Sequence, residues 1–507
     1  MKQLSKHASI LIGTLSLCSC TVGPDYVKPT VATPAHFKEA KNKTVISARD
    51  TKKYHWKQAT PEDSCARGDW WLVFHDAKLN ELEKKLNASN QSLTNAYYNY
   101  QQARAVVDEA RANYFPTLTG TLNVTRQKSG SSSTSFISTS NGSTSTGTAA
   151  TGSSGGGSAI SNNHSWLADA SWAPDIWGLV RRTVESDASA AQASAALYAS
   201  TRLLSQMTLA QTYFELRGLD GIQKLLDDTV ASDKKALALT EHRYASGVAA
   251  RTDVVQAQSV LEAAQALAIN NHILRGQYEH AIAVLIGVPP AAFSLNKNPL
   301  IATPPSIPLE VPSLLLERRP DIAQAERQMA QANAQIGVAV AAYFPTITLT
   351  GTGSTGAKNL GPLFTVPSFS WSLGTQVAET IFEGGLRNAT VKAAKAGYNA
   401  SVANYRQVVL TAFQDVEDNL VSLRTLNEQS IVEKKAVASA ALSLKLIIDQ
   451  YKSGTVDYTS VTTAQVNLLN VQQTALNVNY QRMVSAVGLI KALGGGWNEQ
   501  SIMCVAN

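Results

Sequence analysis

Two long stretches of the chain keep a helical spacing of apolar residues and contain no proline. They run over residues 178–246 and 384–453. A helix of about 65 residues is about 100 Å long at 1.5 Å per residue. Apolar side chains recur there at steps of three and four, the spacing of a coiled-coil seam. The two seams consist of Leu203, Met207, Ala210 and Phe214, and of Phe413, Val416, Leu420 and Leu423.

Four short segments instead alternate apolar with small, mostly polar residues, which predicts β-strands. They lie near residues 117–124, 166–172, 346–351 and 369–374. One apolar face and one polar face is typical of strands with lipid on one side and water on the other. A soluble hairpin with one buried face gives the same pattern, so the strands alone leave both possibilities open.

The chain contains an internal repeat. The segment 112–120 returns at 341–349, 244–247 returns at 451–454, and 257–261 returns at 464–468. Each repeat is predicted to run helix, strand, loop, strand, long helix, turn, helix. The first repeat is longer because it contains 126–164, where 26 of 39 residues are Ser, Thr or Gly. We predict a mobile external loop there, because this composition cannot bury a core.

These patterns give a domain organisation. Residues 1–19 form a signal peptide and 20–76 an N-terminal extended segment. The first repeat occupies 77–288, with its loop at 126–164, and the second occupies 313–492. Between them, 289–312 is a linker, predicted to be extended because seven of the 17 prolines lie there. A C-terminal tail covers 493–507.

The N-terminus has the pattern of a lipoprotein export signal. Lys2 and Lys6 precede an apolar run that is too short to span a membrane. The sequence around Cys20 resembles a lipobox, with Cys20 as the acylated residue; an ordinary signal peptide is the alternative. Export places Cys65 and Cys504 in an oxidising compartment, where a disulfide and two free thiols are both open.

Composition and motifs favour neither an enzyme nor a nucleic-acid-binding protein. The formal charge is only +6, from 44 basic and 38 acidic residues, and it is spread along the chain. There is no phosphate-binding loop, no HExxH, no GxSxG and no C-x-x-C pair. The histidines have no metal-ligand spacing. We therefore predict no catalytic residues, no cofactor and no metal.

Four strands cannot close a barrel, and unpaired strand edges cost several kcal/mol per group in lipid. Strands that span a membrane must therefore come from several chains. Three chains supply twelve strands, which form a barrel wide enough for an aqueous path. Two chains supply eight strands, and side chains nearly fill the interior of a barrel of that size. Together with the long helices, this predicts a conduit from the periplasm to the exterior.

The chain resembles the TolC-like outer-membrane efflux proteins, in the lipid-anchored, NodT-type branch. The resemblance covers essentially the whole mature chain. Its motifs are Cys-Thr-Val-Gly-Pro-Asp-Tyr from Cys20, Tyr-Phe-Pro-Thr before the first strand of each half, Asp-Ile-Trp-Gly at 175–178 against Ile-Phe-Glu-Gly-Gly at 381–385, Arg-Arg-Pro-Asp-Ile at 318–322, and a Tyr-x-x-Gly turn before Ala-Gln in both halves.

The resemblance implies a mainly α fold with a β part: a homotrimer with a 12-stranded transmembrane β-barrel continued by a long periplasmic α-helical barrel. It implies an outer-membrane channel of a tripartite efflux system, a passive duct for drugs or other small molecules without catalytic activity. The implied partners are a periplasmic adaptor and an inner-membrane pump, usually proton-driven. Alternatives are a duct for type I protein secretion and a coiled-coil lipoprotein scaffold without a pore.

In such proteins two helix-turn-helix tips dock the adaptor and close the entrance. The matching positions are Tyr244, Gly247, Asp253, Ala257 and Gln258 in the first half, and Tyr451, Gly454, Ala464 and Gln465 in the second.

Many relatives carry acidic residues in the second turn, which threefold symmetry would make into rings of charge. Here the matching Ser460 and Thr463 are neutral, so Asp457 is the gate candidate. Asp457 is equally suited to cap the following helix. The hairpin that carries Asp253 is expected to lie on the outside.

Overall fold

A computed structural model describes residues 21–31, 33–34, 37–39, 69–128, 160–300, 303–305, 318–361 and 363–495. The chain forms two compact units. The first, here the strand unit, comprises Met1–Pro24, Asp108–Glu185 and Ala334–Ala394. The second, the helical unit, comprises Asp25–Val107, Ser186–Asn333 and Lys395–Asn507. Cys20, Cys65 and Cys504 lie outside the described residues, so the predictions for them stay predictions.

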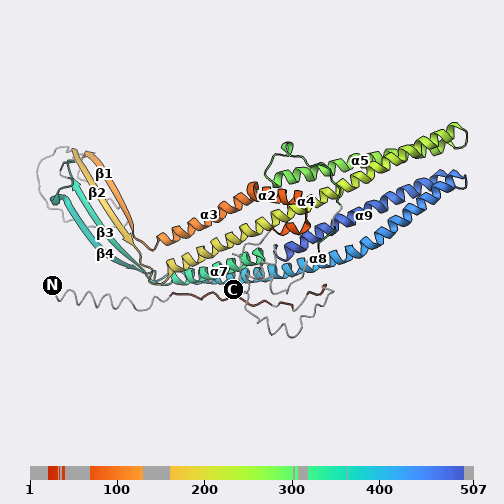
Figure 1. Cartoon of the computed structure of the whole chain (residues 1–507). Coiled ribbons are helices and arrows are strands. Elements are labelled where there is room, and N and C mark those ends of the chain that lie inside the picture. Colours follow the sequence, from red (N-terminus) through yellow and green to blue (C-terminus); the bar gives the residue numbers. More distant parts are fainter. Residues whose placement is uncertain are drawn as a thin grey trace. The chain divides into compact units, whose positions relative to one another are not determined.

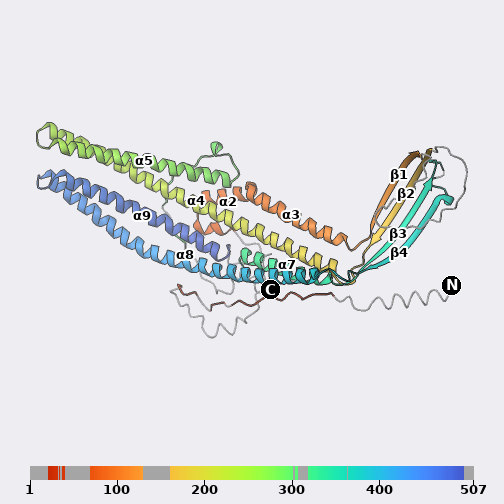
Figure 2. The same cartoon turned by 180° about the vertical axis from the view of Figure 1, so that it is seen from behind.

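The element order confirms the predicted order of each repeat (Figures 1 and 2). The first repeat contains α3 (Gln91–Ala112), β1 (Thr117–Lys128), β2 (Ile160–Trp172), α4 (Leu179–Ala245) and α5 (Arg251–Leu285), preceded by η1 (Trp70–Phe74) and α2 (Ala77–Ser89). The second contains α7 (Pro320–Ala341), β3 (Thr346–Ala357), η4 (Val366–Ser368), β4 (Phe369–Ala378), α8 (Leu386–Lys452) and α9 (Tyr458–Ala492).

The strand unit holds one antiparallel sheet in the order β1-β2-β3-β4. Its register places Leu118 opposite Ala170 and Gly351 opposite Leu373, so the apolar side chains share one face. These side chains are exposed, Leu118 to 76% and Leu373 to 79%. A soluble hairpin would bury this face, whereas lipid covers it in a barrel strand.

The opposite face carries hydroxyl and amide side chains. Thr352 and Ser372 share a hydrogen bond of 2.6 Å, and Ser354 and Ser370 share one of 2.7 Å. This face is suited to water, which fits the barrel strand, one of the two possibilities that the alternating pattern left open.

The predicted loop 126–164 is too wide at both ends. Residues 126–128 belong to β1 and 160–164 to β2, and Arg126 pairs with Asn162. The antiparallel pairing of β1 and β2 continues through these polar residues, because a barrel strand needs no apolar core on its water-facing side. Residues 129–159 lie outside the described part, so the mobility of the loop stays a prediction.

In the helical unit, α5 runs back along α4 and α9 runs back along α8, which makes two long hairpins (Figures 1 and 2). Both long helices, α4 and α8, have 67 residues. Met207, Ala210, Phe214 and Val416 of the predicted seams are fully or almost fully buried. The seams therefore form the packing between helices.

The linker after α5 is fixed at its start by a buried ion-pair network. A short 3-10 helix, η2 (Pro290–Ala292), opens it, and no helix or strand follows up to Leu300. Asp220 of α4 accepts hydrogen bonds from Arg217 at 3.0 Å and from Arg275 of α5 at 2.7 Å. Asp220 also accepts a hydrogen bond of 2.9 Å from the backbone N–H of Asn298. One carboxylate thus joins two helices to the linker.

The N-terminal segment is clamped inside the strand unit. The buried Arg182 donates to the carbonyl oxygens of Val22 and Gly23, both at 3.2 Å. Gly23 has a φ of +101°, and a Cβ there would lie 2.5 Å from the Cα of Gly337. A side chain fits neither the backbone conformation nor the space. The residues that follow Cys20 are therefore tied to both repeats at once.

Glu83 of α2 is a carboxyl group inside the main hydrophobic core. It is fully buried, and neither of its oxygens has a hydrogen-bond partner. Burial, with a smaller contribution from Asp69, raises the pKa of Glu83 to about 9. The side chain is therefore protonated in the folded protein at neutral pH.

We expect Glu83 to make stability fall as pH rises. Its folded pKa of about 9 lies above the unfolded value of 4.5, so unfolding releases a proton between these pH values. Its contribution to stability is complete below pH 4.5 and is lost as pH rises through 9. Glu83→Gln keeps the shape and removes the titration. From pH 5 to 9, the midpoint temperature of thermal unfolding should fall more in wild type than in the variant. If the two midpoints change in parallel with pH, the prediction is contradicted.

Candidate entrance site at the hairpin tips

The two hairpin turns of the helical unit have the same construction. α4 ends before Gly247, with φ +74°, and α8 ends before Gly454, with φ +78°. In the first turn the N–H of Val248 donates to Arg243 O at 2.9 Å, and in the second Thr455 donates to Gln450 O at 3.0 Å. A glycine in the left-handed conformation with this long backbone bond is the Schellman C-cap. The Tyr-x-x-Gly repeat therefore encodes two equal turns.

Near these turns the hairpins are joined to each other. The hydroxyl of Tyr451 on α8 donates to Asp253 on α5 at 3.3 Å. Arg243 of α4 lies over the ring of Tyr451, 4.6 Å from its centroid, and donates to its carbonyl oxygen at 3.4 Å. Burial, reinforced by the nearby Asp253, raises the pKa of Tyr451, so its hydroxyl remains a donor. One tyrosine is thus held by both helices of the other hairpin.

Aromatic packing surrounds this contact. Tyr451 and Tyr458 meet edge to face with ring centroids 5.2 Å apart. Ala257 and Val461 are buried in the same cluster. The predicted site residues Ala257, Tyr451 and Ala464 are therefore buried between helices.

The other predicted positions lie on the surface or at the links. Tyr244, Gly247, Gln258 and Gly454 are exposed. Asp253 is half-buried and holds Tyr451 of the other hairpin.

Asp457 caps α9. Its Oδ1 accepts hydrogen bonds from the N–H of Ser460 at 3.0 Å and from the Ser460 hydroxyl at 2.7 Å. These bonds lower the pKa of Asp457, so the fully exposed carboxylate stays charged. The Thr463 hydroxyl donates a hydrogen bond to the carbonyl oxygen of Thr459 in the same helix. The capping role is confirmed, and it leaves the charge in place.

Four residues of the tips were missed by sequence analysis: Arg243, Tyr458, Thr240 and Asp233. Asp233 and Thr240 are buried polar residues of α4. No motif marks them, because the contacts of Arg243 with Tyr451 and of Asp233 with Gln465 join residues more than 200 positions apart. Only the repeat, which aligns the two turns, could have suggested that they meet.

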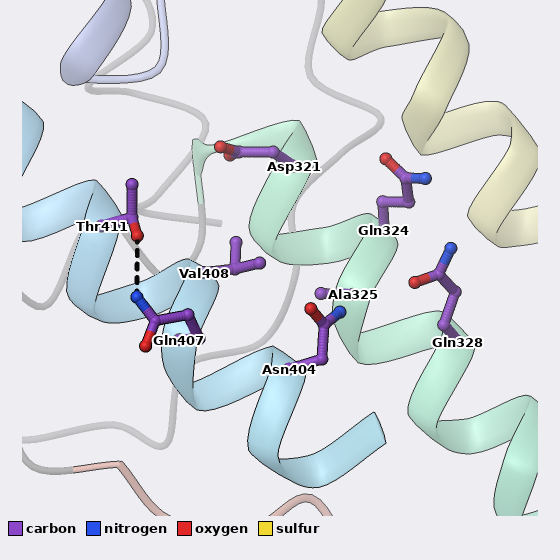
Figure 3. Close-up of a pocket in the computed structure, with 8 residues that line it drawn as sticks. All are labelled: Asp321, Gln324, Ala325, Gln328, Asn404, Gln407, Val408 and Thr411. Carbon is purple, nitrogen blue, oxygen red and sulfur yellow. Dashed lines mark hydrogen bonds between the residues drawn. The ribbon is translucent and has the colours of Figure 1, made fainter. Parts of the chain in front are cut away.

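A pocket lies between α7 and α8 (Figure 3). Its volume is about 340 Å³, and it is lined mainly by carboxamides such as Gln328, Asn404 and Gln407. Its carboxylate, Asp321, is held by Arg319 at 2.7 Å. These lining residues include no nucleophile hydrogen-bonded to a base.

Within the described ranges, no helix is long and apolar enough to cross a membrane. In the same ranges no group of three or more His, Cys, Asp or Glu side chains gathers in a metal-binding arrangement.

The fold and the tips define a class: a chain with a lipid-compatible sheet of four strands and two long helical hairpins that meet at their turns. The family model described as outer membrane efflux protein matches residues 82–288 and 311–495. The chain belongs to this family, whose members are channel and efflux proteins rather than enzymes. It is an outer-membrane efflux channel, with the trimeric barrel and periplasmic helical part of the family.

Relatives match over nearly the full length. The cation efflux system protein CusC of Escherichia coli O6:H1 is 28% identical over 96% of this chain and 97% of its own. The probable efflux pump outer membrane protein TtgC of Pseudomonas putida is 28% identical over 97% and 96%. Among solved structures, the outer-membrane channel OprN has a TM-score of 0.79 at 26% identity, covering 94% of this chain and 100% of that one.

Proposed function

We propose that the chain is the passive outer-membrane duct of a tripartite system that exports drugs or other small molecules. A periplasmic adaptor docks on the exposed parts of the hairpin tips, and an inner-membrane pump, usually proton-driven in this family, supplies the energy. The relatives support a small-molecule cargo, since one is named for cation efflux and another for an efflux pump.

The observation that carries the proposal is the link between the hairpins through Tyr451. A duct needs an entrance that is shut when no pump is attached. The bonds of Tyr451 to Arg243 and Asp253 join the two hairpins close to their turns. We infer that they hold the tips together, and that the entrance opens when they break.

Conductance of the purified protein in planar bilayers tests the proposal. Wild type should insert and carry K⁺ only in brief openings, because the tip links hold it shut. An Arg243→Ala, Asp253→Ala double variant should conduct steadily. A protein that assembles but does not conduct, even as the double variant, would contradict the duct and favour a scaffold.

We propose that Asp457 supplies an acidic ring at the entrance. In a trimer its three exposed carboxylates concentrate cations, and salt screens them over about 10 Å at 0.1 M. Asp457→Asn keeps a capping residue but removes the charge. The cation-to-anion permeability ratio at low salt should fall toward one in this variant. An unchanged ratio would leave Asp457 with its cap alone.

We propose also that Cys20 carries the lipid anchor. Thr21, the next residue, is held by Arg181 at 2.8 Å, which would fix the anchor to the strand unit. Loss of palmitate labelling in Cys20→Ala checks this assignment. The pairing of Cys65 with Cys504 remains open, and thiol counting under denaturing, non-reducing conditions decides it.

A further inference from the structure

A second link joins the hairpins deeper between the helices. The amide nitrogen of Gln465, on α9, donates to Oδ1 of Asp233, on α4, at 3.0 Å. Asp233 is only 4% exposed. Its other oxygen, Oδ2, is buried without a partner, and so is Oε1 of Gln465. Two side chains that already share one hydrogen bond thus each keep one unsatisfied acceptor.

We propose that one proton on Asp233 completes this pair and locks the two hairpins together, so that the entrance is held shut more firmly in acid. The inference rests on the proposed function, because it assigns a second, titratable latch to the same entrance.

The chemistry of the pair favours a proton. An ionised carboxylate has no donor, so Oδ2 and Oε1 of this hydrogen-bonded pair are two buried acceptors that cannot bond each other. A proton on Oδ2 makes this oxygen a donor, and Oε1 can accept its hydrogen bond. The acid and the amide then share two hydrogen bonds, and no buried acceptor is left without a partner.

The surroundings of Asp233 carry no compensating charge. Burial alone raises the pKa of Asp233 to about 6. On α9 the titratable neighbour is Tyr458, whose own pKa is raised chiefly by burial. The next residues of α4, Lys234 and Lys235, are exposed.

The other two helices add no ion pair to Asp233. The side chains of α5 buried along this stretch are Ala257, Leu261 and Ala264, which carry no charge. On α8, Lys445 and Asp449 are exposed.

Opening the tips separates α4 from α9 and returns Asp233 to water, where its pKa approaches 3.8. Opening therefore releases a proton between pH 3.8 and 6. One pH unit below the folded pKa, protonation of each Asp233 should lower the equilibrium constant for opening about tenfold. Above pH 7 this opposition is gone, because Asp233 is ionised in both states.

The test is the open fraction of trimers in planar bilayers with KCl, at pH 5 and pH 7.5. Wild type should open at least tenfold less at pH 5, because each of the three Asp233 side chains contributes about that factor. Asp233→Asn carries a permanent donor in place of the proton, so it should open rarely at both pH values. Gln465→Leu cannot form either bond, so it should open more readily than wild type at both pH values, although the buried Asp233 still titrates in it. Heat-resistant trimers on gels show that each variant has folded.

The result that would overturn the inference is a fall at pH 5 that survives in Asp233→Asn, or a Gln465→Leu variant that opens no more readily than wild type. Such variants would still conduct, so the duct would stand without this latch. If no variant conducts, including the Arg243→Ala, Asp253→Ala double variant, the duct itself is wrong and the latch is rejected with it.

Discussion

Replacing Arg243 by alanine is expected to raise the open fraction of the channel by about tenfold to a hundredfold. The change removes the contact with the Tyr451 ring and the bond to the Tyr451 carbonyl. A cation–π contact at a partly exposed site contributes about 1 kcal/mol. Three chains that open together lose about 3 kcal/mol, and every 1.4 kcal/mol is a factor of ten. Single-channel recording of K⁺ conductance measures the effect.

A matched control is Arg251→Ala. Arg251 is an exposed cation at the first residue of α5, so this variant removes the same charge near the tip and leaves the Tyr451 contacts in place. Tyr451→Phe keeps the ring and loses only the hydroxyl, so its effect should lie between the two. Equal opening in the two arginine variants would mean that charge, rather than the link, controls the entrance.

The sequence predicted the architecture because each of its elements is encoded locally. Proline-free stretches with apolar steps of three and four became α4 and α8, and alternation became the four strands. The glycine turns were predicted from their repeat, and both glycines have the positive φ that such turns require. Each long helix has one apolar seam, and packing the helices side by side is one of the few ways to bury that seam.

The contacts of the entrance could not be predicted, because they join residues with no local relation. Tyr451 and Asp253 are 198 positions apart, and Gln465 and Asp233 are 232 apart. Nothing near Asp253 in the sequence indicates that its partner lies on the other hairpin. The ends of the predicted loop were missed for another reason, since polar strand residues look like loop residues when no core is needed.

Glu83 marks a signal that was available. It lies four residues after Leu79 and three before Leu86, on the face of α2 that enters the core. Helical periodicity therefore places a carboxyl group among leucines. Such a residue must be neutral or paired, and the structure shows it without a partner.

Replacing Asp220 by alanine is expected to destabilise the protein by about 3–5 kcal/mol per chain, the cost of breaking a buried ion pair. The carboxylate is fully buried, and both Arg217 and Arg275 are nearly so. Its loss leaves the buried Arg217 without its anion, leaves Arg275 with Glu279 alone, and frees the Asn298 N–H from its acceptor. Loss of helical circular dichroism on heating should occur at a clearly lower temperature, because the linker, α4 and α5 lose their common partner.

The control is an ion pair of the same charges at the surface. Glu81 bonds Lys78 at 2.8 Å and Lys85 at 2.8 Å, and its side chain is 45% exposed. Exposed pairs contribute about 0–1 kcal/mol, because water competes for both charges. Glu81→Ala should therefore leave the unfolding temperature nearly unchanged. If Asp220→Ala behaves like Glu81→Ala, water must reach the Asp220 site, and the linker must be held to the hairpin by its apolar contacts instead.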